Sequence, residues 1–179
     1  PIPYEAVDME RYLGTFRGRR MFFYQGSRGC PFRCAYCYNA AFNRGRWRAR
    51  SAHLVLEDLR ALRRRYAFDA VYFLDDDFFI DVPRAFAILS GLGAMGLSSV
   101  LQGVDIRTLS RFSDEDLSRL EAWGVERMSI GVESGTDRVR GDVLGKWGSV
   151  DAVRAQLVRL RDRRFLVLCS FVVGFPGET

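Results

Sequence analysis

Short apolar runs alternate along the chain with longer segments that have the periodicity of helices. The apolar runs are rich in β-branched and aromatic residues and are bounded by polar or glycine-containing segments, which is typical of strands. They lie at residues 21–25, 70–74, 99–104, 127–133 and 165–174. The last run is apolar at both alternating sets of positions, and this predicts a strand that helices cover on both faces.

The segments between these runs are predicted to form amphipathic helices, because their apolar residues recur three and four positions apart. The helices are expected to begin at Ser51, Pro83, Ser113 and Ser149. Ser51 can act as an N-cap, and Pro83 has the backbone angle that a first helical turn needs. Gly124 is expected to end the third helix, since glycine readily adopts the left-handed conformation found there. Strands that alternate with helices form βαβ units, so the pattern predicts a parallel sheet.

Polar and reactive side chains follow the predicted strands directly, whereas the returns from helix to strand are plain. A cysteine-containing segment follows the first strand, Asp75–Asp77 follow the second and Gly131–Thr136 end the fourth. The carboxyl ends of parallel strands lie along one edge of a sheet, where ligands bind, so we expect one active face. Too few strand–helix units are present for an eight-stranded barrel. An open partial barrel and a flavodoxin-like doubly wound sheet both fit the pattern.

The segment after the first strand contains Cys30, Cys34 and Cys37 in a C-x3-C-x2-C arrangement, with Tyr36 just before the last cysteine. Thiolates this close together can surround one compact soft-metal centre, and they are ligands of iron–sulfur clusters and of zinc. A 4Fe–4S cluster held by these cysteines alone would have one iron without a protein ligand. That iron would be free to bind a substrate or cofactor directly. A ferredoxin-type electron carrier fits less well, because its cluster needs a further cysteine nearby.

A zinc site is the principal alternative. His53, the only histidine, would complete a Cys3His ligand set with the three cysteines. The protein would then be a zinc-stabilised module that binds nucleic acid or protein, with the arginine-rich segment Arg44–Arg50 as a contact surface. A lone histidine followed by Leu-Val-Leu is more often a surface or packing residue of a helix. The remaining cysteine, Cys169, lies within an apolar run and is expected to be a small buried hydrophobe.

Composition narrows these choices only slightly. The chain has 179 residues, 48% of them hydrophobic, which is enough for one globular domain with a core. The net charge of +5 permits an anionic partner without requiring one, so nucleic acid is not indicated. No apolar run is long enough to cross a bilayer, and the thiols need a reducing compartment, so we expect a soluble, cytoplasmic protein. Because the chain begins at Pro1 and ends at Thr179, we expect a piece of a longer polypeptide.

The spacing of the cysteines and the residues around them resemble the cluster motif of the radical S-adenosylmethionine (radical SAM) enzymes. This resemblance implies that Cys30, Cys34 and Cys37 hold a 4Fe–4S cluster whose open iron binds the amino and carboxylate groups of SAM. In that family, an electron from the cluster cleaves the sulfonium and gives a 5′-deoxyadenosyl radical. The implied fold is α/β, a partial (β/α)6 TIM-type barrel that is truncated after the fifth strand. Residues 21–179 would be the incomplete core, and residues 1–20 a linker after a missing upstream domain.

The resemblance also implies which residues contact SAM. Asp75–Asp77 stand where many family members have Gly-Gly-Glu, and Asp77 aligns with the glutamate that accepts hydrogen bonds from the SAM amino group. Gln102 and Glu133 would bind ribose hydroxyls, and Gly174 would let the strand backbone approach the adenine. The implied cofactor-binding residues are Tyr36, Asp76, Asp77, Gln102, Glu133, Ser134 and Gly174. The sequence identifies no catalytic acid or base.

The SAM carboxylate would need a cation, and two residues beyond the fourth strand are candidates. They are Arg138 and Lys146. Lys146 is the only lysine among 27 basic residues, which suggests a position where a compact ammonium matters. The sequence does not decide between the two.

Several motifs resemble one group within the family, the proteins that carry an upstream cobalamin-binding domain. They are Leu74-Asp-Asp-Asp-Phe, Glu133-Ser-Gly, Gly174-Phe-Pro-Gly-Glu and the opening rich in proline and tyrosine. Many such proteins methylate unactivated carbons or rearrange rings, although a methylthiotransferase or another subclass also fits. Cobalamin would bind in a domain before Pro1. The expected partners are a small-molecule or peptide substrate and a reductant such as ferredoxin or flavodoxin.

Overall fold

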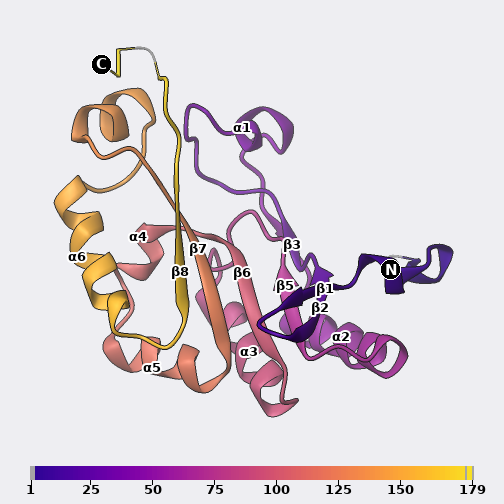
Figure 1. Ribbon diagram of the computed structural model, residues 1–179. Helices are drawn as coiled ribbons and strands as arrows, with labels where there is room; N and C mark the ends of the chain where they lie inside the picture. The colour runs from indigo at the N-terminus through magenta and orange to yellow at the C-terminus, as the bar shows by residue number, and fades with distance from the viewer. Residues whose placement is uncertain (1–2, 176, 179) are drawn as a thin grey trace.

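The computed structural model describes residues 3–175 and 177–178, and a curled mixed sheet lies at its centre (Figure 1). Within these residues the sheet has six strands in the order β1-β2-β5-β6-β7-β8. They are β1 (Gly14–Phe16), β2 (Arg19–Tyr24), β5 (Ala70–Phe73), β6 (Ser98–Val104), β7 (Val125–Glu133) and β8 (Leu166–Phe171). All neighbours pair parallel except β1, which is antiparallel to β2. The five predicted parallel strands are confirmed.

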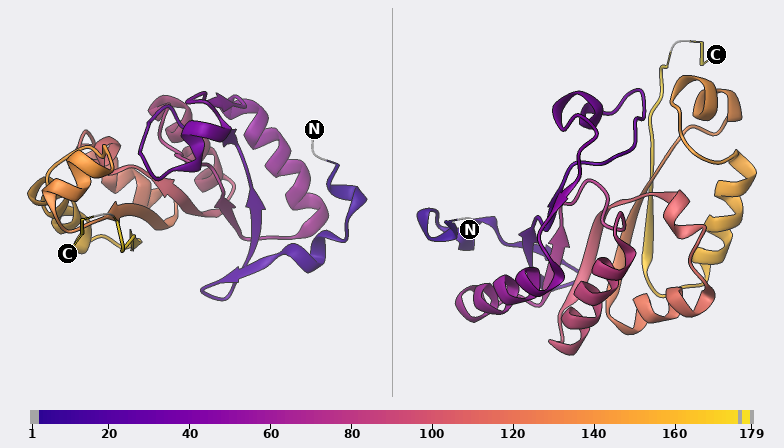
Figure 2. Two further views of the ribbon diagram at one scale, coloured as in Figure 1. Left: turned by 90° about the horizontal axis from the view of Figure 1, so that it is seen from above. Right: turned by 180° about the vertical axis from the view of Figure 1, so that it is seen from behind.

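The long helices of the described chain lie on the convex side of this sheet, as the view from above in Figure 2 shows. They are α2 (Ala52–Tyr66), α3 (Val82–Ala94), α5 (Asp114–Ala122) and α6 (Val150–Arg161). A doubly wound sheet would need helices on both faces, so the flavodoxin-like alternative is wrong. The half-barrel confirms the predicted partial TIM-type barrel, with the carboxyl ends of the parallel strands at one rim. No helix among the described residues is long and apolar enough to span a membrane.

Side-chain caps begin the helices close to where the sequence predicts. Ser51, Ser113 and Ser149 each accept a hydrogen bond from a backbone N–H of the first turn, and Ser113 forms a reciprocal capping box with the third residue of α5. Helix α3 begins one residue earlier than expected, because Asp81 is its N-cap and Pro83 lies within the first turn. These local hydrogen bonds set the boundaries between helices and the preceding loops.

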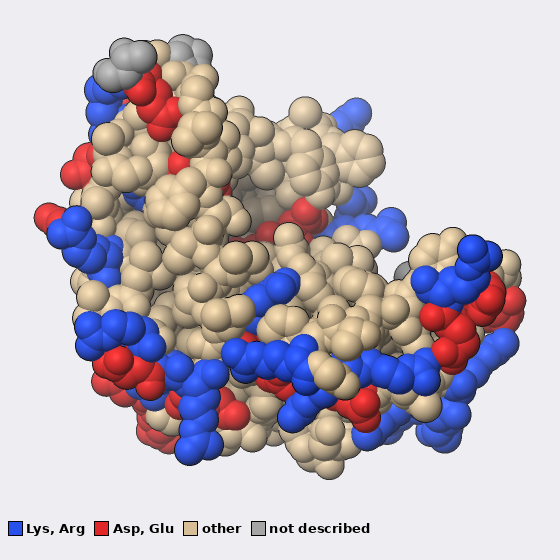
Figure 3. Space-filling view, in the orientation of Figure 1, with Lys and Arg blue, Asp and Glu red and all other residues tan. Residues whose placement is uncertain are grey.

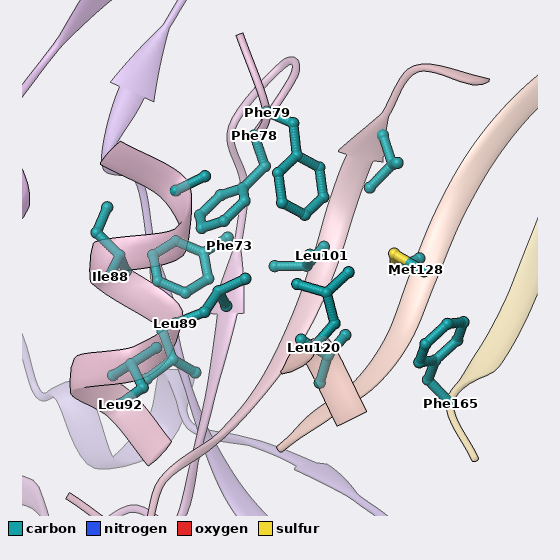
Figure 4. Close-up of a cluster of buried hydrophobic side chains, with 14 of the residues drawn as sticks. Phe73, Phe78, Phe79, Ile88, Leu89, Leu92, Leu101, Leu120, Met128 and Phe165 are labelled. Atoms are coloured by element: carbon teal, nitrogen blue, oxygen red, sulfur yellow. The ribbon is translucent and has the colours of Figure 1, made fainter. Parts of the chain in front are cut away.

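The main hydrophobic core fills the space between the sheet and the helices (Figure 4). Phe73 of β5 and Leu101 of β6 point toward Leu89 of α3, and all three side chains are fully buried. Phe78 and Phe79 follow directly after the acidic triplet and pack into the same core. Burial of each such side chain stabilises the fold by about 1.5–3 kcal/mol. The rim of the sheet that carries the polar residues is therefore anchored by large apolar groups.

Strand β8 differs from its prediction. The sequence predicts cover on both faces, but Leu166 and Leu168 on the inner face have exposed fractions of 45% and 46%. The alternate residues Val167 and Cys169 pack against the core on the helix side. Because β8 is the edge strand of the described sheet and its inner face lies uncovered, only one of its two apolar faces is buried. The prediction of two-sided burial is wrong.

Short elements around the main sheet carry no periodic signal. They are β1, the paired strands β3 (Ser27–Arg28) and β4 (Arg48–Ala49), α1 (Tyr38–Phe42), α4 (Ile106–Leu109), the 3-10 helices Tyr4–Ala6 and Met9–Tyr12, and a π-helix at Val139–Val143. Strand β1 lies in the segment expected to be a linker. The β3–β4 pair brings together the two ends of the long loop that contains the cysteines.

Candidate active site

A cavity of about 240 Å³ opens at the carboxyl ends of the parallel strands. Figure 3 shows a hollow in the upper part of the molecule, with acidic side-chain atoms at its base. Its walls include all three clustered cysteines and most of the predicted cofactor-binding residues, namely Tyr36, Asp76, Asp77, Gln102 and Glu133. Lys146 also lines it, whereas Arg138 does not. The predicted active face is thus present, and it is built from the cysteine loop, the ends of β5, β6 and β7, the loop that contains Lys146, and β8.

The three cysteine thiols lie on the loop that leaves β2, and all are free and partly buried. A turn with a 3.0 Å hydrogen bond from the Cys37 N–H to the Cys34 carbonyl shapes the loop. Burial is the largest influence on the pKa of Cys30, which it raises to about 12, and it also raises the pKa of Cys34. Because metal ligation requires the thiolate, a bound cation would have to offset this penalty.

Glycine is required just before the first of these cysteines. Gly29 has a φ of +86°, and a Cβ atom placed on it would lie 1.9 Å from the Arg46 carbonyl oxygen. Any side chain there would push the two arms of the loop apart. The close approach therefore depends on both the backbone conformation and the missing Cβ.

The three consecutive aspartates after β5 have different surroundings. Asp75 is fully buried and accepts hydrogen bonds from the Gly26 N–H at 2.9 Å and the Ser27 hydroxyl at 2.5 Å. Asp76 accepts from the Gly29 N–H at 2.7 Å and the Tyr38 hydroxyl at 2.6 Å. Two members of the triplet are thus bonded to the loop that carries the cysteines.

Asp77 is the member of the triplet that faces the cavity with an unused acceptor. Its side chain is 3% exposed, and one oxygen accepts a 3.1 Å hydrogen bond from the Phe79 N–H. The other oxygen, Oδ2, is buried without a hydrogen-bond partner among the described residues. Burial, followed by the nearby charge of Asp105, raises the pKa of Asp77 to about 7. A cationic donor in the cavity would form a hydrogen bond with the unpaired oxygen and would stabilise the buried negative charge of Asp77.

Glu133 joins the cysteine loop to the end of β7. Its Oε1 accepts a 2.6 Å hydrogen bond from the Tyr36 hydroxyl and lies 3.2 Å from Lys146 Nζ. The side chains of Glu133 and Lys146 are each 8% exposed, and Lys146 also donates to the Gly131 carbonyl at 2.5 Å. Glu133 has a φ of +70°, a conformation that costs on the order of 1–3 kcal/mol for a residue other than glycine. Burial, followed by the hydrogen bond to Glu133, raises the pKa of Tyr36.

Arg140 holds the loop that contains Lys146 in place, and no pattern in the sequence predicts this role. Its side chain is fully buried, and it donates to the backbone carbonyls of Val132, Trp147 and Gly148. Two of these carbonyls belong to the loop that contains Lys146, so the guanidinium holds this loop against the end of β7. An arginine between valine and glycine in a polar segment resembles a solvated surface charge, and only the tertiary structure reveals its burial.

The remaining predicted residues are placed less directly. The carboxamide oxygen of Gln102 accepts the Tyr72 hydroxyl, which leaves the amide nitrogen as its group for a ligand. Ser134 is buried beside Thr136 and Glu178 and does not line the cavity. Gly174 lies beyond the end of β8, with a φ of +91°, and its N–H donates to Glu178 at 2.7 Å.

The structure does not bring His53 to the cysteines. His53 is exposed in the first turn of α2 and is not part of the cavity wall. Among residues 3–175 and 177–178, no three histidine, cysteine, aspartate or glutamate side chains form a group that could hold a single metal ion. The Cys3His zinc site is therefore not formed by the described residues.

The chain is similar to several known proteins. The family model "Radical SAM superfamily" matches residues 24–179. An uncharacterised methyltransferase of Pyrococcus horikoshii, PH0819, is 29% identical over 184 residues, which cover 100% of this chain and 38% of the relative. Cytidylyl-2-hydroxyethylphosphonate methyltransferase of Streptomyces wedmorensis is 26% identical over 151 residues, which cover 84% of this chain and 28% of that methyltransferase. The chain thus spans well under half of these curated relatives.

Among solved structures, the radical SAM methyltransferase TsrM from Kitasatospora setae, with cobalamin and a 4Fe–4S cluster bound, is similar with a TM-score of 0.77. The match covers 97% of this chain and 34% of TsrM at 18% sequence identity. At this identity, the similarity shows a shared fold.

Proposed function

The chain belongs to the radical SAM superfamily, and we propose that it holds a 4Fe–4S cluster through Cys30, Cys34 and Cys37 and binds SAM for reductive cleavage. The observation that carries this proposal is the shared cavity: three free thiols open onto the same space as the unpaired buried oxygen of Asp77. Thiols suit a cluster, and an unpaired carboxylate oxygen suits an ammonium group. Both kinds of ligand atom meet at the carboxyl rim of a half-barrel.

The donor set of the cavity fits a polynuclear cluster better than a single ion. Cluster-bound cysteines attach to different irons, so their sulfur atoms do not need to converge on one point. Such an arrangement agrees with three thiols that line one cavity without forming a mononuclear group among the described residues. A bound cluster would supply the electron that breaks the SAM sulfonium and gives a 5′-deoxyadenosyl radical. The residues of this chain would bind and orient SAM and keep water away.

The geometry suggests how the cavity would hold SAM. Asp77 Oδ2 would accept the SAM ammonium, and Lys146 is better placed than Arg138 to pair with its carboxylate. The Gln102 amide and the second oxygen of Glu133 would bind the ribose. Ser134 and Gly174 stay predicted contacts from the family resemblance, beside the ribose and the adenine. Tyr36 would act through its hydrogen bond to Glu133.

The subclass that we propose is a cobalamin-dependent radical SAM methyltransferase or a related radical enzyme. The support is that curated relatives are named methyltransferases and that TsrM binds both cobalamin and a 4Fe–4S cluster. Residues 21–179 would be the SAM-binding core, and residues 1–20 would link it to an upstream cobalamin-binding domain. The substrate would be a small molecule or a peptide, and the electron would come from a ferredoxin or flavodoxin in the cytoplasm.

The test is a measurement of iron, sulfide and zinc after anaerobic reconstitution, followed by EPR of the reduced protein with and without SAM. We expect a near-stoichiometric 4Fe–4S cluster and a spectrum that changes when SAM is added, because SAM would bind the open iron. Zinc without sulfide, or a cluster whose spectrum ignores SAM, would overturn the proposal.

A further inference from the structure

We propose that Asp76 is a positioning residue that holds the cysteine loop, residues 29–38, in place, and that it is not a SAM ligand. The inference rests on the proposed function in one respect, since it takes Cys30, Cys34 and Cys37 as the cluster ligands. The geometry of the carboxylate and its two hydrogen bonds belongs to the chain itself.

The two oxygens of Asp76 bind opposite ends of the cysteine loop. Oδ2 accepts the N–H of Gly29, directly before Cys30, at 2.7 Å. Oδ1 accepts the hydroxyl of Tyr38, directly after Cys37, at 2.6 Å. One carboxylate therefore closes the loop on both sides of the three thiols.

This arrangement needs a carboxylate. Both partners are donors, so each Asp76 oxygen must be an acceptor, and an asparagine amide would offer only one. Hydrogen bonds to an ionised acceptor are stronger than those between neutral groups.

The scaffold holds Asp76 itself in place. The Phe78 N–H donates to the Gly103 carbonyl of β6 at 2.9 Å. A Cβ atom on Gly103 would lie 2.3 Å from the Asp76 carbonyl oxygen and 2.6 Å from that of Asp75, so the backbones of β6 and the triplet are in close contact. The carboxylate thus projects from a rigid strand end toward a loop that has little regular structure of its own.

The neighbouring aspartates have different hydrogen-bond partners from those of Asp76. Asp75 binds the start of the long loop at Gly26 and Ser27, before the cysteine loop begins. Asp77 makes no hydrogen bond to the cysteine loop among the described residues and keeps a free oxygen for the cavity. Only Asp76 has both oxygens engaged by residues that flank the thiols.

The test compares Asp76→Asn and Tyr38→Phe with the wild type, with Asp77→Asn as the matched control from the same triplet. The first measurement is amide hydrogen exchange in the chain before cluster assembly, with the β8 segment around Cys169 as an internal reference. We expect exchange at Gly29 and around Tyr38 to be about tenfold faster in Asp76→Asn, the size expected for loss of one charged hydrogen bond. Tyr38→Phe should speed exchange mainly at the Tyr38 end. Asp77→Asn should leave the loop unchanged.

The second measurement uses the reconstituted protein. We expect a chelator to remove iron several-fold faster from Asp76→Asn and Tyr38→Phe than from the wild type or Asp77→Asn. The EPR spectrum of the reduced cluster without SAM should also change in Asp76→Asn, because the loop geometry around the cluster changes. A general loss of folding would instead speed exchange in the β8 reference as well.

The proposal is overturned if Asp76→Asn leaves loop exchange and iron release unchanged while it weakens only the response of the cluster to SAM. That pattern would make Asp76 a SAM ligand. It is also overturned if exchange rises equally in the loop and the reference. If Asp76→Asn does not fold, Tyr38→Phe decides, since it removes one hydrogen bond of an exposed ring. If the wild type takes up no iron, the proposed function fails, but the exchange experiment still decides the role of Asp76.

Discussion

The two halves of the rim hold their functional side chains in different ways. On the β2–β5 side, Asp75 and Asp76 bind the loop that carries the cysteines, and Arg84 donates to the carbonyls of Gly26 at 2.9 Å and Arg50 at 2.7 Å. On the β7–β8 side, Glu133 has an unfavourable φ, Arg140 supports the Lys146 loop, and the edge strand exposes its inner apolar face. The first half is pre-organised by several buried hydrogen bonds. The second half also has buried hydrogen bonds, but it includes a residue with an unfavourable φ and an edge strand whose inner face is exposed.

This difference fits separate roles for the two halves, with the first holding the cluster and the second binding SAM. Thiols that share a cluster must keep their mutual positions before it assembles, so their loop benefits from rigid anchors. A cofactor that enters and leaves benefits from a wall that can adjust. Variants of matched residues on the two sides test this view.

The largest effect is expected for the cysteines themselves. Cys34→Ala should abolish cluster assembly, whereas Cys169→Ala, on β8, should leave it intact. The reason is that Cys34 lines the cavity, while Cys169 packs against the core on the helix side of the sheet. Iron and sulfide analysis after reconstitution measures both. Equal loss in the two variants would contradict the ligand assignment.

The pH dependence of stability should reveal Asp77. Its pKa is raised from 3.8 to about 7 in the folded chain, so the folded state holds this proton more tightly than the unfolded state does. The resulting stabilisation is complete below the unfolded pKa and is lost as the pH rises through about 7. Three pH units correspond to about 4 kcal/mol. Asp77→Asn should therefore gain up to this amount relative to the wild type between about pH 4 and about pH 8.

Urea unfolding of the cluster-free protein at the two pH values measures this difference. A variant whose stability relative to the wild type does not change with pH would show that Asp77 titrates normally. An Asp114→Asn variant is a suitable control, because the side chain of Asp114 is 76% exposed.

The two buried arginines test the comparison most directly. Arg84→Met and Arg140→Met should each lower the free energy of unfolding by about 3 kcal/mol, because buried carbonyls, and Asp75 in the first case, lose a cationic neighbour. The local consequences should differ. Hydrogen exchange should increase around Gly26 and Arg50 in the first variant and around Lys146 in the second. If both variants loosened the same segment, the two halves would not be independent.

The smallest effect is expected on the exposed face of β8. Leu166→Ser should change the free energy of unfolding by no more than about 0.5 kcal/mol, because nearly half of this side chain is already exposed. Leu101, on the helix side of β6, is the buried residue for comparison. Leu101→Ala should lower the free energy of unfolding by about 3 kcal/mol. Denaturant midpoints of the two variants compare them. A large loss for Leu166→Ser would mean that the inner face of β8 is more tightly packed than its exposure indicates.

The sequence alone determined the parallel strands, the approximate starts of the long helices and the location of the cysteine loop. Helix periodicity, serine caps and cysteine spacing are local features, and they act between residues only a few positions apart. The order of motifs along the chain also predicted that Asp77, Gln102 and Glu133 would meet the cysteines, because parallel strands place their carboxyl ends at one rim.

How these residues are used depends on the tertiary structure. It placed Lys146 rather than Arg138 at the cavity, buried Arg140, assigned different partners to Asp75, Asp76 and Asp77, and left one face of β8 exposed. The contacts responsible join residues far apart in the chain, such as Gly29 with Asp76 and Tyr36 with Glu133. Their partners are chosen by the packing of strands and loops in space, and no local pattern of residues encodes that choice.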